Sequence, residues 1–189
     1  MSAPKRGTLI VAALASAAIL AVSGIAVWRH LGGSGGDTPA QRSAVIAPVS
    51  AALTASGEHS EQCTAGIRAL TETSATGTAE VLDSLERCGE TARLLADHGY
   101  GALDTDTTTP GSPLRAAYLD AAGALFSVYE LQGDDFDVIF DMLHRARSTG
   151  APLTGPASDA AHILGNGAPD VDAARKEAAR AEAAYRKRG

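Results

Sequence analysis

The sequence predicts an all-α protein in which one amino-terminal membrane-spanning helix is followed by an antiparallel helical bundle. Its 189 residues include 39 alanines but only three phenylalanines, four tyrosines and one tryptophan. Alanine is the strongest helix former, whereas aromatic residues favour strands. Apolar residues beyond residue 38 recur at spacings of three and four, as on one face of a helix. Long periodic segments separated by short turns are typical of a bundle.

The amino-terminal segment, residues 1–30, has the pattern of a membrane anchor. Lys5 and Arg6 precede residues 8–28, which contain no charged side chain. At about 1.5 Å per residue this stretch spans about 31 Å, enough to cross a hydrocarbon core of about 30 Å. The basic pair outnumbers Arg29, which predicts a cytoplasmic amino end and an extracytoplasmic remainder. The anchor positions along the stretch include Thr8, Leu14, Leu20 and Trp28.

A cleaved secretory signal is the alternative interpretation of this segment. It would use residues 9–20 as its apolar region and be cut near Ser23. The apolar run continues to Trp28, a residue suited to the membrane interface, and this favours an uncleaved anchor at the bacterial cytoplasmic membrane. Either interpretation exports the rest of the chain. That remainder is expected to comprise a glycine-rich linker (31–37), a helical domain (38–165) and a charged carboxy-terminal helix (166–189).

The first helix of the domain is predicted to start with a capping box. Thr38 is the N-cap, Pro39 takes the first helical position and Gln41 closes the box. Pro48 and Gly57 predict a kink or break. The apolar seam of this helix comprises Ile46, Val49, Leu53, Ser56, Ser60, Cys63, Ile67 and Leu70.

A turn at 73–77 is expected to lead into a second helix that begins after Thr78 and ends at Gly99. Residues 100–111 are rich in Thr, Gly and Asp, which predicts a loop. The seam of the second helix comprises Val81, Leu85, Cys88, Ala92 and Leu95.

The second half of the domain is expected to contain two full helices and a shorter one. Ser112 caps a third helix that stops at Gly133, and Asp134 caps a fourth that stops at Gly150. A short helix over 156–164 precedes the last one, at 169–187. The inward residues of the third and fourth helices are Leu114, Tyr118, Ala121, Leu125 and Val128, then Phe136, Ile139, Phe140 and Leu143. The last helix has a narrow stripe, expected to lie against a groove without anchoring a core: Val171, Ala174, Ala178, Ala181 and Tyr185.

Cys63 and Cys88 are equidistant from the middle of the 73–77 turn and lie on the seams of their helices. Such positions face each other in two antiparallel helices, so a disulfide is expected in an exported domain. In the entropic model, closing a loop of about 25 residues stabilises the fold by roughly 3–4 kcal/mol. His59, four residues before Cys63, supplies a third potential metal ligand. The sequence has no Cys-x-x-Cys or paired-histidine spacing, so we predict no metal and no cofactor.

No set of residues in the sequence forms a recognisable catalytic motif. The carboxylates of Asp134, Asp135 and Asp137 are explained by the first turn of the predicted fourth helix, where they complement the helix dipole. Asp141 and His144 are three residues apart, a spacing more often found in a helix-surface contact. We therefore predict that the protein is not an enzyme.

Charge divides the exported part into an acidic body and a basic end. Residues 37–172 carry 7 basic and 20 acidic side chains, whereas residues 173–189 carry six basic and two acidic ones. The acidic body disfavours nucleic acid, whose binding needs many basic contacts. The basic end could contact anionic lipid or a partner, although cations are also favoured at a helix C-terminus for local reasons. Its candidate interaction residues are Arg186, Lys187 and Arg188.

Three glycines, Gly99, Gly133 and Gly167, are spaced by 34 residues. Apolar residues flank the second of them: Leu125 and Tyr129 before it, then Phe136, Ile139, Leu143 and Ala146. Over at most 70 residues this pattern resembles the tetratricopeptide family. The resemblance implies stacked helical hairpins as the alternative fold, and it assigns no functional residue.

Two functions fit these features. The first is a tethered, non-enzymatic interaction or scaffolding module of the bacterial cell envelope, held in the lipid bilayer by its first helix and binding an envelope protein. The second is an extracytoplasmic sensor that binds a small ligand between helices, under the 100–111 loop. A bacterial origin is suggested by 13 arginines against 3 lysines together with the abundant alanine, a composition typical of GC-rich coding.

Overall fold

The computed structural model describes residues 36–72, 78–104 and 111–188. Five helices account for nearly all of these residues. Four are long and one, α3, is a short segment that a two-residue turn at 86–87 separates from α4. The helices are α2 (Pro39–Glu72), α3 (Thr78–Leu85), α4 (Cys88–Leu103), α5 (Pro113–Ser148) and α6 (Thr154–Arg188).

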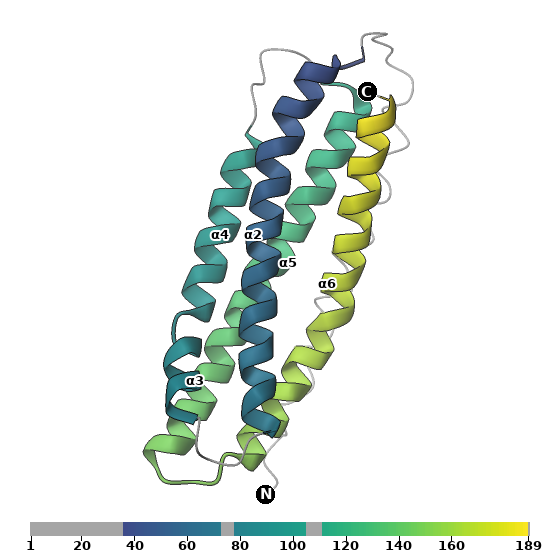
Figure 1. Ribbon diagram of the computed structural model, residues 1–189. Helices are drawn as coiled ribbons and strands as arrows, with labels where there is room; N and C mark the ends of the chain where they lie inside the picture. Colours follow the sequence, from purple (N-terminus) through teal and green to yellow (C-terminus); the bar gives the residue numbers. More distant parts are fainter. Residues whose placement is uncertain (1–35, 73–77, 105–110, 189) are drawn as a thin grey trace, which may run out of the picture. The chain divides into compact units, whose positions relative to one another are not determined.

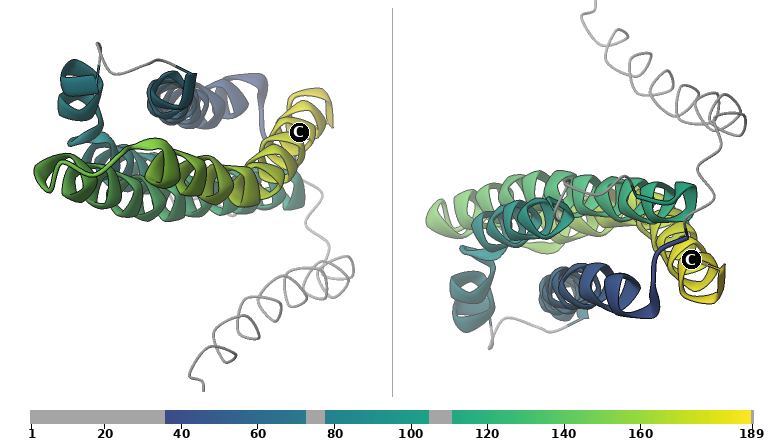
Figure 2. Two further views of the ribbon diagram at one scale, coloured as in Figure 1. Left: turned by 90° about the horizontal axis from the view of Figure 1, so that it is seen from below. Right: turned by 90° about the horizontal axis from the view of Figure 1, so that it is seen from above.

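The four long helices form an antiparallel bundle (Figure 1). α2 packs against α4 and α6, and α5 packs against the same two helices from across the bundle (Figure 2). Successive long helices run in opposite directions along the bundle (Figure 1). The predicted all-α bundle is therefore confirmed.

The predicted membrane anchor, with Thr8, Leu14, Leu20 and Trp28, lies outside the described residues. So do the turn at 73–77 and most of the 100–111 loop. None of the helices built from described residues combines the length and the apolar character needed to cross a bilayer.

Helix α2 begins as the sequence predicts and continues without a break to Glu72. The backbone N–H of Thr38 donates to Gln41 Oε1 at 2.8 Å, and the N–H of Gln41 donates to Thr38 Oγ1 at 3.3 Å. The helix runs through Pro48 and Gly57, so the expectation of a break at these residues is wrong. The predicted seam is correct: Ile46, Val49, Ser56, Ser60, Cys63 and Ile67 are buried, and Leu53 and Leu70 are half-buried.

The expected helix stops at Gly99 and Gly133 are wrong. Gly99 lies inside α4, and Gly133 lies in the middle of α5, which is one continuous helix. Close packing explains both glycines: a Cβ on Gly99 would overlap the Phe126 ring at 2.3 Å, and one on Gly133 would make a tight contact of 3.1 Å with Ala92 Cβ. The third glycine of the 34-residue spacing, Gly167, lies inside α6. The spacing therefore marks no repeat turns, and the structure is a bundle and not a stack of tetratricopeptide-like hairpins.

Helix α6 joins the two helices expected at 156–164 and 169–187, and it passes through Pro169. Its carboxy-terminal half is part of the core, contrary to the expectation from its narrow stripe. Tyr185 is fully buried and stacks on Tyr118 with ring centroids 5.9 Å apart. The ring of Tyr185 contributes much of this packing, because aromatic side chains bury a large apolar area.

The core has a different composition at the two ends of the bundle. At one end, the cystine-end core comprises Cys63, Ile67, Leu82, Leu85, Cys88, Ala92, Phe136, Ile139, Leu143, Ala160 and Leu164. At the other, the tyrosine-end core comprises Val45, Ile46, Val49, Ala52, Tyr118, Ala122, Phe126 and Tyr185. A small cluster of Leu125, Tyr129, Val171 and Ala178 joins α5 to α6.

Candidate functional site

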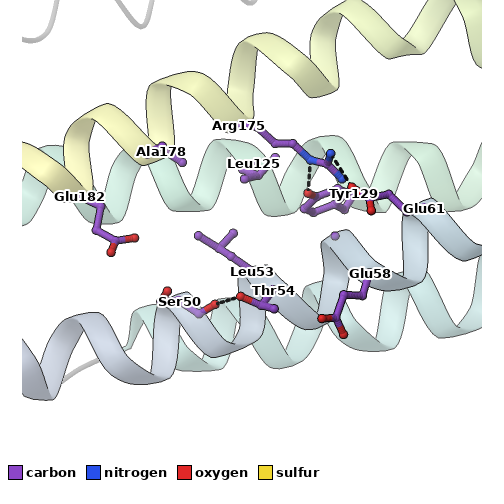
Figure 3. Close-up of a pocket in the computed structure, with 12 residues that line it drawn as sticks. Ser50, Leu53, Thr54, Glu58, Glu61, Leu125, Tyr129, Arg175, Ala178 and Glu182 are labelled. Atoms are coloured by element: carbon purple, nitrogen blue, oxygen red, sulfur yellow. Dashed lines mark hydrogen bonds and ion pairs between the residues drawn. The ribbon is translucent and has the colours of Figure 1, made fainter.

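A groove with a cavity volume of about 330 Å³ opens between α2 and α6. Residues from α5 also line it, and the side chains of the three helices converge there (Figure 3). Its apolar surface comes from Leu53 of α2, Leu125 of α5 and Ala178 of α6. We name this feature the α2–α6 groove.

Arg175 is the cation of the groove and connects all three helices. Its Nε–H donates to the hydroxyl oxygen of Tyr129 at 2.8 Å, and its Nη1 donates to Glu61 Oε1 at 2.9 Å (Figure 3). The guanidinium also lies 5.7 Å from the centroid of the Tyr129 ring. Gly57 leaves room for this contact, since a Cβ there would lie 3.1 Å from the tyrosine hydroxyl.

The surroundings of Arg175 keep it charged. Burial lowers the pKa of its guanidinium, but the hydrogen bonds to Tyr129 and Glu61 outweigh burial, and the net pKa is raised. The ion pair with Glu61 is nevertheless solvent-accessible, because the glutamate side chain is 69% exposed. Exposed pairs of this kind contribute roughly 0–1 kcal/mol, so Glu61 can exchange its cation partner at little cost.

Three carboxylates line the groove: Glu58, Glu61 and Glu182. Glu61 pairs with Arg175, and Glu182 pairs with Arg186 at 2.7 Å, one helical turn further along α6. Glu58 is exposed and makes no ion pair with any described residue. Acidic groups beside an apolar surface suit a ligand that carries a cation on a methylene chain.

The structure places the two cysteines of the sequence prediction together. Cys63 is joined to Cys88, and their Cα atoms are 6.0 Å apart. This confirms the prediction that the two cysteines lie close enough to form a disulfide. His59 lies beside it: its Nε2 is 3.5 Å from Cys63 Sγ and 2.9 Å from the carbonyl oxygen of Cys88. This cluster is separate from the α2–α6 groove, since none of its residues lines that groove.

The basic end of the chain is the other predicted interaction site. Arg186 contacts Glu182 through both Nε and Nη2, and Lys187 is exposed. The side chain of Arg188 lies outside the described part of the structure. Its role in binding lipid or a partner stays a prediction.

The acidic residues expected at a helix start lie in the middle of α5 instead, because α5 does not stop at Gly133. Asp134 and Asp137 pair with Arg93 of α4 at 3.1 and 2.8 Å, which explains them as a contact between helices. Burial, and then the charge of Asp134, raises the pKa of Asp135.

Asp141 and His144 are exposed on α5, where the ring of His144 lies 5.5 Å from that of Phe140. The structure therefore gives the histidine an aromatic neighbour on its own helix.

The groove residues Glu61, Tyr129 and Arg175 were not identified from the sequence. They lie 68 and 46 residues apart and form no local motif. The sequence offered one indication of the groove: Arg175 lies next to Ala174 in the alanine stripe of the last helix.

Comparison of the chain with protein-family models, with curated proteins and with solved structures found no match. The case for a function therefore rests on the groove and the cysteine cluster.

Proposed function

We propose that the chain is a membrane-tethered, exported interaction module of the bacterial cell envelope that does not act as an enzyme. In this proposal the α2–α6 groove binds a basic segment of a partner protein. The observation that carries the proposal is the set of carboxylates beside the apolar lining of the groove. A lysine or arginine side chain would lay its methylenes on Leu53 and Leu125 and bring its charge to Glu58 or Glu61.

Charge complementarity supports a basic partner. The body of the domain carries 20 acidic against 7 basic side chains over residues 37–172, and such a field accelerates encounter with a cationic segment. The same field disfavours nucleic acid. The exposed pair of Arg175 and Glu61 also suits binding, because Glu61 can exchange Arg175 for the charge of a bound segment at little cost.

The proposed location depends on the amino-terminal segment. The uncharged stretch of residues 8–28 behind Lys5 and Arg6 supports an uncleaved anchor in the bilayer, and the cysteine pair fits an oxidising compartment. The intact mass of the protein extracted from its host tests this. A retained amino-terminal segment supports the anchor, whereas loss of residues up to about Ser23 would replace it with a secreted protein.

A photo-crosslinking amino acid in the groove tests the partner proposal. At Thr54, an exposed residue of α2 that lines the groove, it should capture an envelope protein through a basic segment. At Ala124, an exposed residue of α5 outside the groove, it should not.

Charge reversal provides the matched control for that experiment. Glu58→Lys should abolish capture from Thr54, because a cation would then meet the basic segment. Glu86→Lys changes the net charge equally in the exposed turn before α4 and should leave capture intact. Equal capture in both variants, or a crosslinked segment without basic residues, would contradict the proposal.

The second candidate function is a sensor for a small organic cation. The volume of about 330 Å³ favours it, since small-molecule sites occupy about 300–1,000 Å³. A panel of alkyl amines and polyamines should then raise the melting temperature of the wild type but not of Glu58→Lys. A shift with amines and no crosslinked protein would favour the sensor.

A further inference from the structure

The cysteine cluster holds three potential metal ligands. The ligand atoms of His59, Cys63 and Cys88 all lie within 4.8 Å of one another. His59 and Cys63 are four residues apart on one face of α2, and Cys88 is the first residue of α4. We propose that reduction of the Cys63–Cys88 bond converts this cluster into a binding site for Zn²⁺.

The spacing of the ligands fits that ion. With Zn–S bonds of about 2.3 Å and a Zn–N bond of about 2.0–2.1 Å, tetrahedral geometry puts nitrogen about 3.5 Å from each sulfur. The separation between His59 Nε2 and Cys63 Sγ is already 3.5 Å. The same geometry puts the two sulfurs about 3.8 Å apart, which cysteines on two packed helices reach by changing side-chain rotamers.

Burial of the thiols favours a metal over a free thiolate pair. Cys63 and Cys88 are each 4% exposed and belong to the cystine-end core. Unpaired charge is costly in such surroundings. Two thiolates, one neutral imidazole and Zn²⁺ sum to zero charge, so the complete site is compatible with an apolar environment.

The conversion balances as a two-electron step. A dithiol reductant gives two electrons and two protons to the disulfide and becomes a disulfide itself, leaving two cysteine thiols. Zn²⁺ then displaces both thiol protons. In the oxidised chain His59 Nε2 donates its proton to the carbonyl oxygen of Cys88. When Nε2 binds the metal that hydrogen bond is lost, and the proton moves to Nδ1 by tautomerisation, so the imidazole stays neutral. Three protein ligands leave a fourth position for water.

Zinc titration of the full chain in detergent micelles tests the proposal. The protein is reduced with a phosphine without oxygen, and Zn²⁺ is partitioned against a chromophoric chelator. We expect one Zn²⁺ per reduced chain and none per oxidised chain. Loss of an outer-shell partner alone typically costs 10–100-fold in metal affinity, so loss of the ligand in His59→Ala should cost at least about 100-fold.

His98→Ala is the matched control, since it removes an exposed histidine of α4 and should bind zinc like the wild type. Cobalt in place of zinc should give thiolate charge-transfer absorption that needs both cysteines. Circular dichroism reports whether the reduced chain keeps its helices, and zinc should raise its melting temperature. Unchanged affinity in His59→Ala, or binding by the oxidised chain, would overturn the proposal. So would a reduced chain that unfolds and is not restored by zinc.

Discussion

The two ends of the bundle are stabilised in different ways. The cystine-end core combines a covalent link with aliphatic residues and one buried ring, that of Phe136. The tyrosine-end core has no cysteine and instead packs Phe126 with the stacked pair of Tyr118 and Tyr185. The comparison shows how an alanine-rich chain can stabilise a bundle. A disulfide links the helices at one end, and stacked aromatic residues fill the core at the other.

The largest expected effect comes from removing a ring at the tyrosine end. Phe126 is fully buried, and Phe126→Ala should lower the free energy of unfolding by about 3–5 kcal/mol, because the cavity adds to the lost burial. Phe140→Ala removes a half-buried ring at the cystine end and should cost less. Urea denaturation of both variants checks this. A loss in Phe126→Ala no larger than that in Phe140→Ala would contradict this order.

Removing the crosslink should have the next largest effect. Cys63→Ala with Cys88→Ala should lower the free energy of unfolding by about 3–4 kcal/mol if the entropy of the closed loop dominates. Hydrogen exchange should accelerate first around Leu82 and Leu85, which pack near the cysteines. Acceleration confined to the tyrosine end would contradict the assignment of the crosslink to one end.

High pH should destabilise the tyrosine end selectively. Burial, and then the nearby Asp37 carboxylate, raises the pKa of Tyr185 to about 12 from its ordinary value of 10. Because the folded state favours the neutral phenol, this stabilisation of about 3 kcal/mol is complete below pH 10 and is lost as the pH rises through 12. Burial raises the pKa of Tyr118 as well. Phenolate absorbance and helicity, followed together, should show a transition that Tyr185→Phe weakens.

Substitution of two glycines of α4 should change stability less, and in opposite directions for the two positions. Gly99→Ala should destabilise by about 1–3 kcal/mol, since its Cβ would overlap the Phe126 ring. Gly101→Ala, two residues further on, meets nothing within 4 Å and should stabilise by roughly 0.5–1 kcal/mol through helix propensity. The melting temperatures of the two variants, each compared with the wild type, test this prediction. Stabilisation by both would show that the close packing at Gly99 relaxes freely.

The smallest expected effect is the loss of one hydroxyl. The Tyr118 hydroxyl is buried and has no hydrogen-bond partner among the described residues. Tyr118→Phe should therefore stabilise the fold by about 1 kcal/mol, because an unpaired polar group no longer has to be buried. Destabilisation in urea would indicate a partner for this hydroxyl.

Helix type and the buried seams could be predicted because both depend on short-range periodicity. The capping box at Thr38 and the buried face of α2 are examples. The cysteine pair could be predicted because both residues are equally far from the turn that joins their helices. The helix ends at Gly99 and Gly133 could not be predicted in the same way. A glycine that stops a helix and one that lets two helices approach closely look alike in sequence, and only the position of the Phe126 ring separates them.

The α2–α6 groove could not be predicted for a similar reason. Arg175 reaches Tyr129 and Glu61 only because α6 continues past Pro169 and returns along α2. Contacts across 46 and 114 residues depend on the tertiary arrangement, and residue types alone do not specify them.

The proline inside α6 gives this helix an internal division. Pro169 has no amide hydrogen, so the carbonyl four residues earlier, at Gly165, receives no helical bond from it. Gly165 and Gly167 add two weak helix formers to the same turn. Backbone hydrogen bonding is therefore weakest in the turn of α6 that precedes Arg175. The position of Arg175 in the groove depends on the packing of Val171, Ala178 and Tyr185 on the far side of that turn.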